Sequence, residues 1–308
     1  MRKILVLLIL LLGAAFVWNR WPQPVPQIPA GVALPQANAP AGLRFSLVKT
    51  ADAKTLEAFT YAGGSLFKTA GINHIAVLVE HPQGRFLFDS GLGTEVEKQF
   101  ATIPFWARPF LAFQNLRPAV GQLETANIAA PERIILSHAH WDHASALGDF
   151  PNAQVWVTPE EKHFVDTGHP PVVLPTQFEF PPERWHLYEL SSGPYAGFDR
   201  SLDLFGDGSA VLLPLPGHTP GSVGLLLSLP SGERYFFVGD LAWNQAGVTG
   251  PHRKFSLASK IVDLDPDTNW KALLQVRGLL DANPKLHIVP AHDEAVQDAI
   301  GYLPNWVQ

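Results

Sequence analysis

The sequence predicts an α/β fold in which two β-sheets pack face to face and are covered by helices. Many short runs rich in β-branched and aromatic residues alternate with a few helical patterns. The 308 residues are 46% hydrophobic, which is enough for a large core, and 28 prolines with 25 glycines indicate many turns and loops. These observations favour a layered mixed fold over a helical bundle.

The expected strands follow one another between turn residues. The runs 72–80 and 85–89 flank a Pro-Gln-Gly turn and predict a hairpin. Further strands are expected at 133–136, 154–157, 185–190, 210–215, 223–227, 234–238 and 286–289. Helices are expected at 94–100, 159–165 and 267–281.

The amino terminus carries the pattern of an export signal. Arg2 and Lys3 precede an apolar run over residues 4–18. A cleavable signal peptide and a membrane anchor both agree with this length, and we favour the anchor because Trp18 and Arg20 resemble an interfacial belt. We expect membrane association through residues 4–18, with the rest of the chain outside the cytoplasm, in the periplasm if the cell is Gram-negative.

The rest of the chain divides into a spacer and one domain. Residues 19–41 are dominated by Pro, Ala and Gln, a composition that favours extended polyproline conformation. The predicted organisation is therefore a signal peptide or anchor at 1–18, a spacer at 19–41 and a folded domain at 42–308. Two segments, 101–118 and 168–183, look like insertions, and either could line the mouth of a site. The aromatic first one could instead close the core or face the membrane near the anchor.

Charge and cysteine content exclude several classes of function. A formal net charge of −6 gives no electrostatic support for binding nucleic acid. The absence of cysteine rules out disulfides, thiolate ligands and a cysteine nucleophile. Any metal site must therefore use histidines and carboxylates.

A histidine-rich segment directly follows the strand expected at 133–136. His138 and His140 alternate on an extended turn and can share one metal ion, while Asp142 and His143 can reach a second. Nitrogen and carboxylate ligands without sulfur suit zinc best, with manganese, iron, cobalt and nickel as alternatives.

Three later strands also lead into metal-type residues. The strand at 210–215 is followed by His218 between Gly217 and Gly221, the strand at 234–238 by Asp240, and the strand at 286–289 by His292. Four strand ends with potential ligands indicate one shared site.

Each remaining candidate has a competing interpretation. Asp293 or His287 could replace His292, although a histidine inside a strand is more often packed in the core. The other histidines are expected on the surface or in loops: His74, His81, His163, His169, His186 and His252.

These motifs resemble those of the metallo-β-lactamase superfamily. The pattern His-x-His-x-Asp-His, then Pro-Gly-His-Thr-x-Gly, then Gly-Asp and a late His spans residues 138–292, and Asp89-Ser90-Gly91 resembles an early Asp-Thr/Ser-Gly element of that family. The resemblance implies a four-layer αββα sandwich with the site at the edge between the sheets. It also implies two divalent ions, with zinc as the best match.

The family's ligand roles can be carried over residue by residue. The resemblance implies that the first ion is held by His138, His140 and His218, and the second by Asp142, His143 and His292. Asp240 would bridge both ions, and Asp142 and Asp240 would take part in catalysis. Asp89 would brace the metal loop by hydrogen bonding.

The resemblance also implies a metal-dependent hydrolase that acts on a small molecule. A hydroxide bridging the two ions would attack the substrate. The ligand set is similar to that of acyl-homoserine lactonases and of the organophosphate and aryl-ester hydrolases, which implies lactone or ester hydrolysis. Lactonases commonly place a Tyr three residues beyond the bridging Asp, whereas this chain has Trp243, which supplies no hydroxyl. The related organophosphate hydrolases have an apolar pocket in this region, which this chain could build from Trp243, Phe105, Trp106, Phe110 and Phe113.

Several alternatives compete with lactone or ester hydrolysis. β-Lactamase or phosphotriesterase activity could use the same site, and a non-catalytic metal-binding protein of the cell envelope is a third possibility. Zinc β-lactamases with a cysteine ligand are excluded, and the short chain after His292 disfavours glyoxalase II-like thioesterases. His140 disfavours the diiron oxidoreductases, which generally have a carboxylate there.

Overall fold

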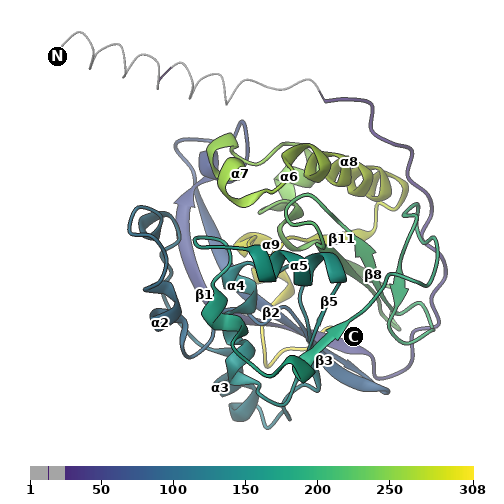
Figure 1. Ribbon diagram of the computed structural model, residues 1–308. Helices are drawn as coiled ribbons and strands as arrows, with labels where there is room; N and C mark the ends of the chain where they lie inside the picture. The colour runs from purple at the N-terminus through teal and green to yellow at the C-terminus, as the bar shows by residue number, and fades with distance from the viewer. Residues whose placement is uncertain (1–12, 14–24) are drawn as a thin grey trace, which may run out of the picture.

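The computed structural model describes residue 13 and residues 25–308, which form two β-sheets covered by helices (Figure 1). The first sheet has the order β1-β2-β3-β4-β5-β6 and the second β11-β10-β9-β8-β7. The strands of the first sheet are β1 (Arg44–Leu56), β2 (Thr69–His81), β3 (Gly84–Phe88), β4 (Arg133–Ile135), β5 (Gln154–Val157) and β6 (Trp185–Leu187). Those of the second are β7 (Leu202–Asp203), β8 (Ala210–Pro214), β9 (Val223–Ser228), β10 (Arg234–Phe237) and β11 (Leu286–Val289).

Helices cover both outer faces of this pair of sheets. They are α2 (Val96–Phe100), α3 (Ala119–Thr125), α4 (Trp141–Ala144), α5 (Pro159–Thr167), α6 (Gln245–Thr249), α7 (Ser256–Val262), α8 (Pro266–Ala282) and α9 (Glu294–Ile300). The expected αββα sandwich is therefore confirmed, and each predicted strand and helix is present, with the predicted bounds for β5 and β11 and with shifted ends for the others. The sequence prediction missed β1, the short β7 and five of the helices in the described residues: α3, α4, α6, α7 and α9.

The alternation of side chains along the second sheet places the core on both of its faces. Leu212 and Leu225 point to the first sheet, where they pack with Phe45 and Phe88. The neighbouring residues face the other way and pack under α8: Val211, Leu213, Leu226 and Phe236 meet Trp270, Leu273 and Val276. The outer face of the first sheet is covered in the same way by α3 and the 144–150 segment. Burial on both sides holds the sheets in register.

The amino-terminal export segment lies outside the described residues, apart from residue 13. In the part of the chain that the structure describes, no helix is long and apolar enough to cross a membrane. Residues 25–41 of the expected spacer form neither helix nor strand, yet they run along the domain. The Leu34 N–H donates to Asn283 Oδ1 at the end of α8, and the Gly31 and Gly278 backbones approach so closely that neither position has room for a Cβ.

The two expected insertions pack around the histidine-rich segment. In the second, Val172 accepts a hydrogen bond from the Trp141 N–H, and Gln177 donates to the Trp141 carbonyl. In the first, Phe113 packs on the Trp141 ring, whereas Phe105 and Phe110 are 81% and 85% exposed. The aromatic segment therefore closes part of the core and also presents apolar side chains to solvent.

Candidate metal centre

Loops at the ends of four strands bring the predicted ligands together at one edge of the sandwich. Residues 138–143 follow β4, His218 follows β8, Asp240 follows β10 and His292 follows β11. Gly217 has a φ of +125°, and a Cβ there would collide with the Asn269 backbone. The loop that carries His218 can therefore turn inward only with glycine at this position.

The first group of ligands consists of three histidines. One nitrogen each from His138, His140 and His218 lies within 4.8 Å of the others, and the His138 and His218 Nε2 atoms are 3.1 Å apart. Burial lowers the pKa of all three rings, and the mutual repulsion of the neighbouring rings lowers those of His138 and His140 further. The imidazoles are therefore neutral, which is the form that binds a metal ion.

The second group is built around Asp142 and Asp240. The Asp142 Oδ2 atom lies 3.4 Å from His292 Nε2 and 3.9 Å from His143 Nε2. The Asp240 Oδ1 atom lies 3.1 Å from His292 Nε2 and 3.4 Å from His143 Nε2, while its Oδ2 lies 3.4 Å from His218 Nε2. One oxygen of Asp240 thus faces each group of ligands, which is the geometry expected of a bridging carboxylate.

Buried polar atoms without hydrogen bonds show that these residues fit divalent metal ions. Among the described residues, His140 Nε2, His143 Nε2 and Asp240 Oδ1 are buried and lack a hydrogen-bond partner. Each such atom costs about 1–3 kcal/mol if nothing satisfies it. A cation would satisfy all three at once, and the nitrogen and oxygen donors suit zinc or a related divalent ion.

Hydrogen bonds to the Nδ1 atoms of His143 and His292 fix the way in which each ring presents its Nε2 atom. Asp89 accepts from His143 Nδ1 at 2.8 Å, as expected of a bracing residue, and also accepts from the Ser137 backbone N–H at 2.6 Å. His292 Nδ1 donates to the Asn73 carbonyl at 2.7 Å. Such partners set the tautomer and orientation of metal-binding histidines.

His218 is held by a buried ion pair that the sequence did not indicate. Asp263 Oδ1 lies 2.7 Å from His218 Nδ1 and 2.6 Å from Lys254 Nζ. Burial raises the pKa of Asp263, but the Lys254 ammonium and His218 outweigh this effect. The pKa is therefore below its usual value and the carboxyl is ionised. No motif surrounds Asp263 or Lys254, so only the fold brings them to the site.

Glu161 joins two metal-binding loops and was also missed. Its Oε1 accepts from the Ala139 N–H at 2.6 Å, between His138 and His140, and its Oε2 accepts from Thr219 Oγ1 at 2.6 Å and from the Gly221 N–H at 3.0 Å. Thr158 and Glu161 have the spacing of a capping box, which is typical of a helix start. That pattern predicts the helix but not that the glutamate side chain turns away to the loops.

Three histidines lie in environments other than those predicted. His74 and His81 are buried, so their assignment to the surface or to loops was wrong, and His74 Nδ1 lies 3.2 Å from Asp142 Oδ2. His287 is exposed on β11 and pairs with Glu233, so it is not a core residue. Asp293, the neighbour of His292, accepts from the Val296 N–H and caps α9, which leaves His292 as the residue in the site.

Trp243 contacts the Asp240 carboxylate directly. Its Nε1–H donates to Asp240 Oδ2 at 2.9 Å, and the Lys254 ammonium lies 5.8 Å from its ring. The indole thus acts as a hydrogen-bond donor at the position where the resemblance to lactonases leads one to expect a phenol.

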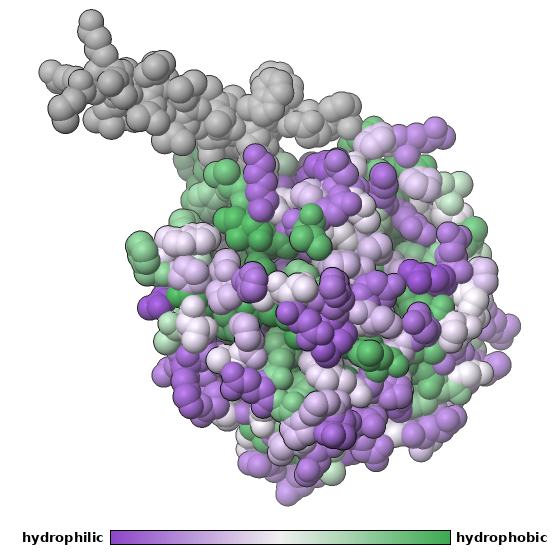
Figure 2. Space-filling view, viewed as in Figure 1, coloured by the Kyte–Doolittle hydropathy of each residue, from purple (hydrophilic) through white to green (hydrophobic). Residues whose placement is uncertain are grey.

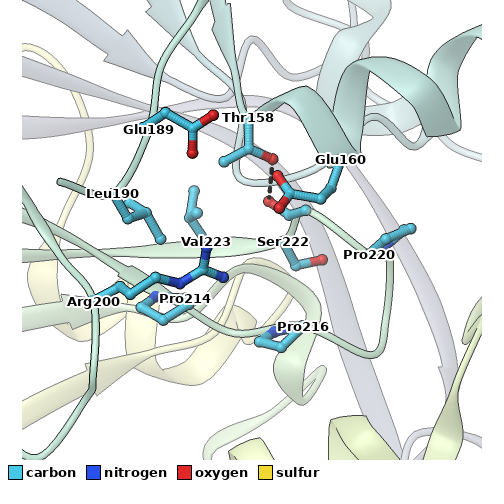
Figure 3. Close-up of a pocket in the computed structure, with 11 residues that line it drawn as sticks. Thr158, Glu160, Glu189, Leu190, Arg200, Pro214, Pro216, Pro220, Ser222 and Val223 are labelled. Atoms are coloured by element: carbon cyan, nitrogen blue, oxygen red, sulfur yellow. Dashed lines mark hydrogen bonds between the residues drawn. The ribbon is translucent and has the colours of Figure 1, made fainter.

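A small pocket adjoins the loop that carries His218 but contains none of the predicted ligands (Figure 3). Thr158, Pro216, Pro220 and Ser222 line it together with the charged Glu160, Glu189 and Arg200. The pocket is therefore separate from the candidate metal ligands.

Residues 71–292 match the family model of the metallo-beta-lactamase superfamily. The chain belongs to this superfamily. The matched range contains the seven predicted ligands, and with the histidine and aspartate groups described above it makes the chain a metal-dependent hydrolase.

The similar proteins include named lactonases. The chain is 27% identical over 197 residues to "N-acyl homoserine lactonase AttM" of Azorhizobium caulinodans, which covers 56% of this chain and 68% of the relative. It is 30% identical over 205 residues to "Probable metallo-hydrolase Rv2300c" of Mycobacterium tuberculosis, covering 61% and 62%.

Solved structures share the fold over most of the chain. An N-acyl homoserine lactone hydrolase with the product N-hexanoyl-L-homoserine at its catalytic metal centre has a TM-score of 0.68 at 15% identity, covering 86% of this chain and 98% of the other. AidC, a dizinc quorum-quenching lactonase, has a TM-score of 0.57 at 18% identity, covering 86% and 92%. At such low identity the likeness establishes the fold.

Proposed function

We propose that this chain hydrolyses small lactones or esters that carry an apolar substituent. The observation that carries the proposal is the placement of Asp240 between two groups of ligands, His138, His140 and His218 on one side and Asp142, His143 and His292 on the other. The lactonases among the similar proteins support the same class of substrate.

Asp240 and Trp243 would have different roles in hydrolysis. When bound, two divalent ions would ionise a water molecule near neutral pH and polarise the scissile carbonyl oxygen. Asp240 would orient the attacking water and take up its proton, because its carboxylate faces both groups of ligands. Trp243 holds that carboxylate through Oδ2, so the reacting geometry is set before substrate arrives.

Apolar side chains near the site favour a hydrophobic substituent on the substrate. The Leu264 N–H donates to the His218 carbonyl, and Leu264, Leu257 and Ile261 are exposed on and beside α7. Figure 2 shows hydrophobic residues gathered on this part of the surface. An acyl or aryl group could bury this area when it binds.

A panel of substrates tests the proposal on the full-length, metal-loaded protein in detergent. We expect turnover of lactones and aryl esters, with kcat/KM rising as the acyl chain lengthens. Two bound ions per chain without turnover of any lactone or ester would contradict the proposal.

Phosphotriester hydrolysis is a second candidate, and Trp243 favours it. An indole next to Asp240 supplies an apolar wall and no hydroxyl for a lactone carbonyl. In the same panel, a phosphotriester with a higher kcat/KM than every lactone would replace the first proposal by this one.

We also propose that residues 4–18 direct export and hold the domain outside the cytoplasm. The support is the charge-then-apolar order of the sequence, with Arg2 and Lys3 ahead of the run. Protease added to intact spheroplasts should degrade the domain, and protection until the cells are lysed would contradict export.

A further inference from the structure

His74 lies in the metal centre although it belongs to none of the motifs. It is on β2, it is 6% exposed, and its Nδ1 atom is 3.2 Å from Asp142 Oδ2. One nitrogen of His74, one oxygen of Asp142 and one nitrogen of His292 lie within 4.8 Å of one another. The ligand atoms of His138, His140 and His218 lie within the same limit of one another.

His74 Nδ1 lies 3.2 Å from Asp142 Oδ2 but is not aligned with it as a hydrogen-bond donor. His74 Nδ1 is buried and has no hydrogen-bond partner, a property that it shares with His140 Nε2 and His143 Nε2. A poorly aligned contact is weak as a hydrogen bond, so the buried His74 nitrogen still needs a partner. A cation shared with Asp142 and His292 would supply it.

The backbone around His74 holds the ring in this direction. A β-bulge in β1 between Lys49 and Ala51 lies opposite His74, where the register shifts from the Lys49–Ile75 pair to the Ala51–His74 pair. The extra residue, Thr50, donates its hydroxyl to the His74 carbonyl at 2.9 Å. Bulges of this kind re-aim side chains and occur next to active sites.

Packing on both sides restricts the ring further. The His74 ring contacts His292 edge-on at a centroid distance of 5.2 Å and lies 5.9 Å from the Trp141 ring. A ligand on a strand that is fixed by its neighbours is already in position before the ion binds.

We propose that His74 is a further ligand of the second metal ion and binds it through Nδ1. The inference rests on the divalent-metal centre of the proposed function. The second ion would then be held by Asp142, His143, His292, Asp240 and His74, and the additional ligand is neutral, so it leaves the charge of the site unchanged.

The decisive measurement is a crystal structure of the zinc-loaded wild-type protein. We expect His74 Nδ1 at about 2.0–2.1 Å from the second ion, the usual zinc–imidazole distance. An Nδ1 atom more than about 3 Å from the ion and hydrogen-bonded to Asp142 would overturn the proposal, because His74 would then only position the carboxylate.

A variant tests in solution whether His74 binds the second ion. His74→Phe keeps an aromatic ring against Trp141 and His292 but removes the ligand atom. We expect the first ion to stay bound and the affinity for the second, measured by competition with a chelator, to fall by at least about 100-fold, the upper end for loss of a merely supporting hydrogen bond. In the cobalt-loaded protein, the number of paramagnetically shifted imidazole N–H signals should fall by one.

His81→Phe is the matched control. His81 lies on the same strand, is equally buried and stacks on Phe205, away from the centre. This control should retain both ions and all shifted signals. Unchanged affinity and an unchanged number of signals in His74→Phe would refute the inference.

The outcome is separable from that of the proposed function. Coordination by His74 without turnover of lactones or esters would refute the function and support the inference. Turnover with two ions bound and His74 uncoordinated would support the function and refute the inference.

Discussion

Replacing Glu161 by Gln should remove a pH-dependent loss of stability. Glu161 is 1% exposed, and burial raises the pKa of its carboxyl from 4.5 to about 7, although three donors from the metal-binding loops lower it. Between these two pKa values the folded protein holds a proton that the unfolded chain releases. The stabilisation from this group is therefore complete below about pH 4.5 and is lost as the pH rises through about 7.

The magnitude follows from the size of the shift. A shift from 4.5 to about 7 corresponds to about 3 kcal/mol in the free energy of unfolding, most of which falls between pH 5 and pH 8. Glutamine cannot ionise, so Glu161→Gln should lack this pH-dependent part of the free energy of unfolding. Any stability that the variant loses with its hydrogen bonds would be the same at each pH.

The assay is urea unfolding of the metal-free protein at pH 5 and pH 8. The wild-type free energy of unfolding should fall by about 2–3 kcal/mol more than that of Glu161→Gln over this interval, since the other titrating groups contribute equally to both proteins. Glu160→Gln, at the exposed neighbouring position, is the control and should follow the wild type. Equal pH dependence in wild type and Glu161→Gln would refute the reasoning.

Three further substitutions test the site and the core. Asp142→Ala should leave about one ion per chain by elemental analysis and abolish turnover, because the second site loses its unshared carboxylate; full activity would refute the ligand assignment. Trp243→Phe removes the donor to Asp240 Oδ2 and should lower kcat about tenfold in steady-state assays, as a bond to a charged acceptor is worth about 1.5–3 kcal/mol; an unchanged kcat would show that the bond plays no part in catalysis. Phe236→Ala empties a fully buried position under α8 and should cost about 3–5 kcal/mol in urea unfolding, whereas Phe67→Ala, at a side chain that is 97% exposed, should cost less than about 0.5 kcal/mol; equal costs would contradict the packing described for the core.

The sequence predicted the elements that carry a local signal. The hairpin of β2 and β3 has alternating apolar residues and a clear turn, and the ligand motifs stand directly after β4, β8, β10 and β11. β1 escaped prediction because its residues 49–55 include Lys, Asp and Thr, and its strand conformation comes from pairing with β2 rather than from its own pattern.

The residues missed at the site depend on contacts between distant segments. His74 is 68 positions from Asp142 in the chain, and its place in the centre follows from the bulge in β1 and the packing of Trp141. Asp263 and Lys254 reach His218 only because α7 folds over its loop. A single sequence shows no pattern for such contacts, since neither the spacing nor the residue type is unusual.

The division of the ligands between the sheets ties the ions to the architecture. Residues 138–143 extend from the first sheet, whereas His218, Asp240 and His292 extend from the second. A cation bound by residues of both sheets would link the two layers, so separating the sheets would release it. A higher concentration of free ion would therefore stabilise the folded sandwich. Loss of the metal would therefore make the protein more susceptible to proteolysis in addition to removing its metal-dependent activity.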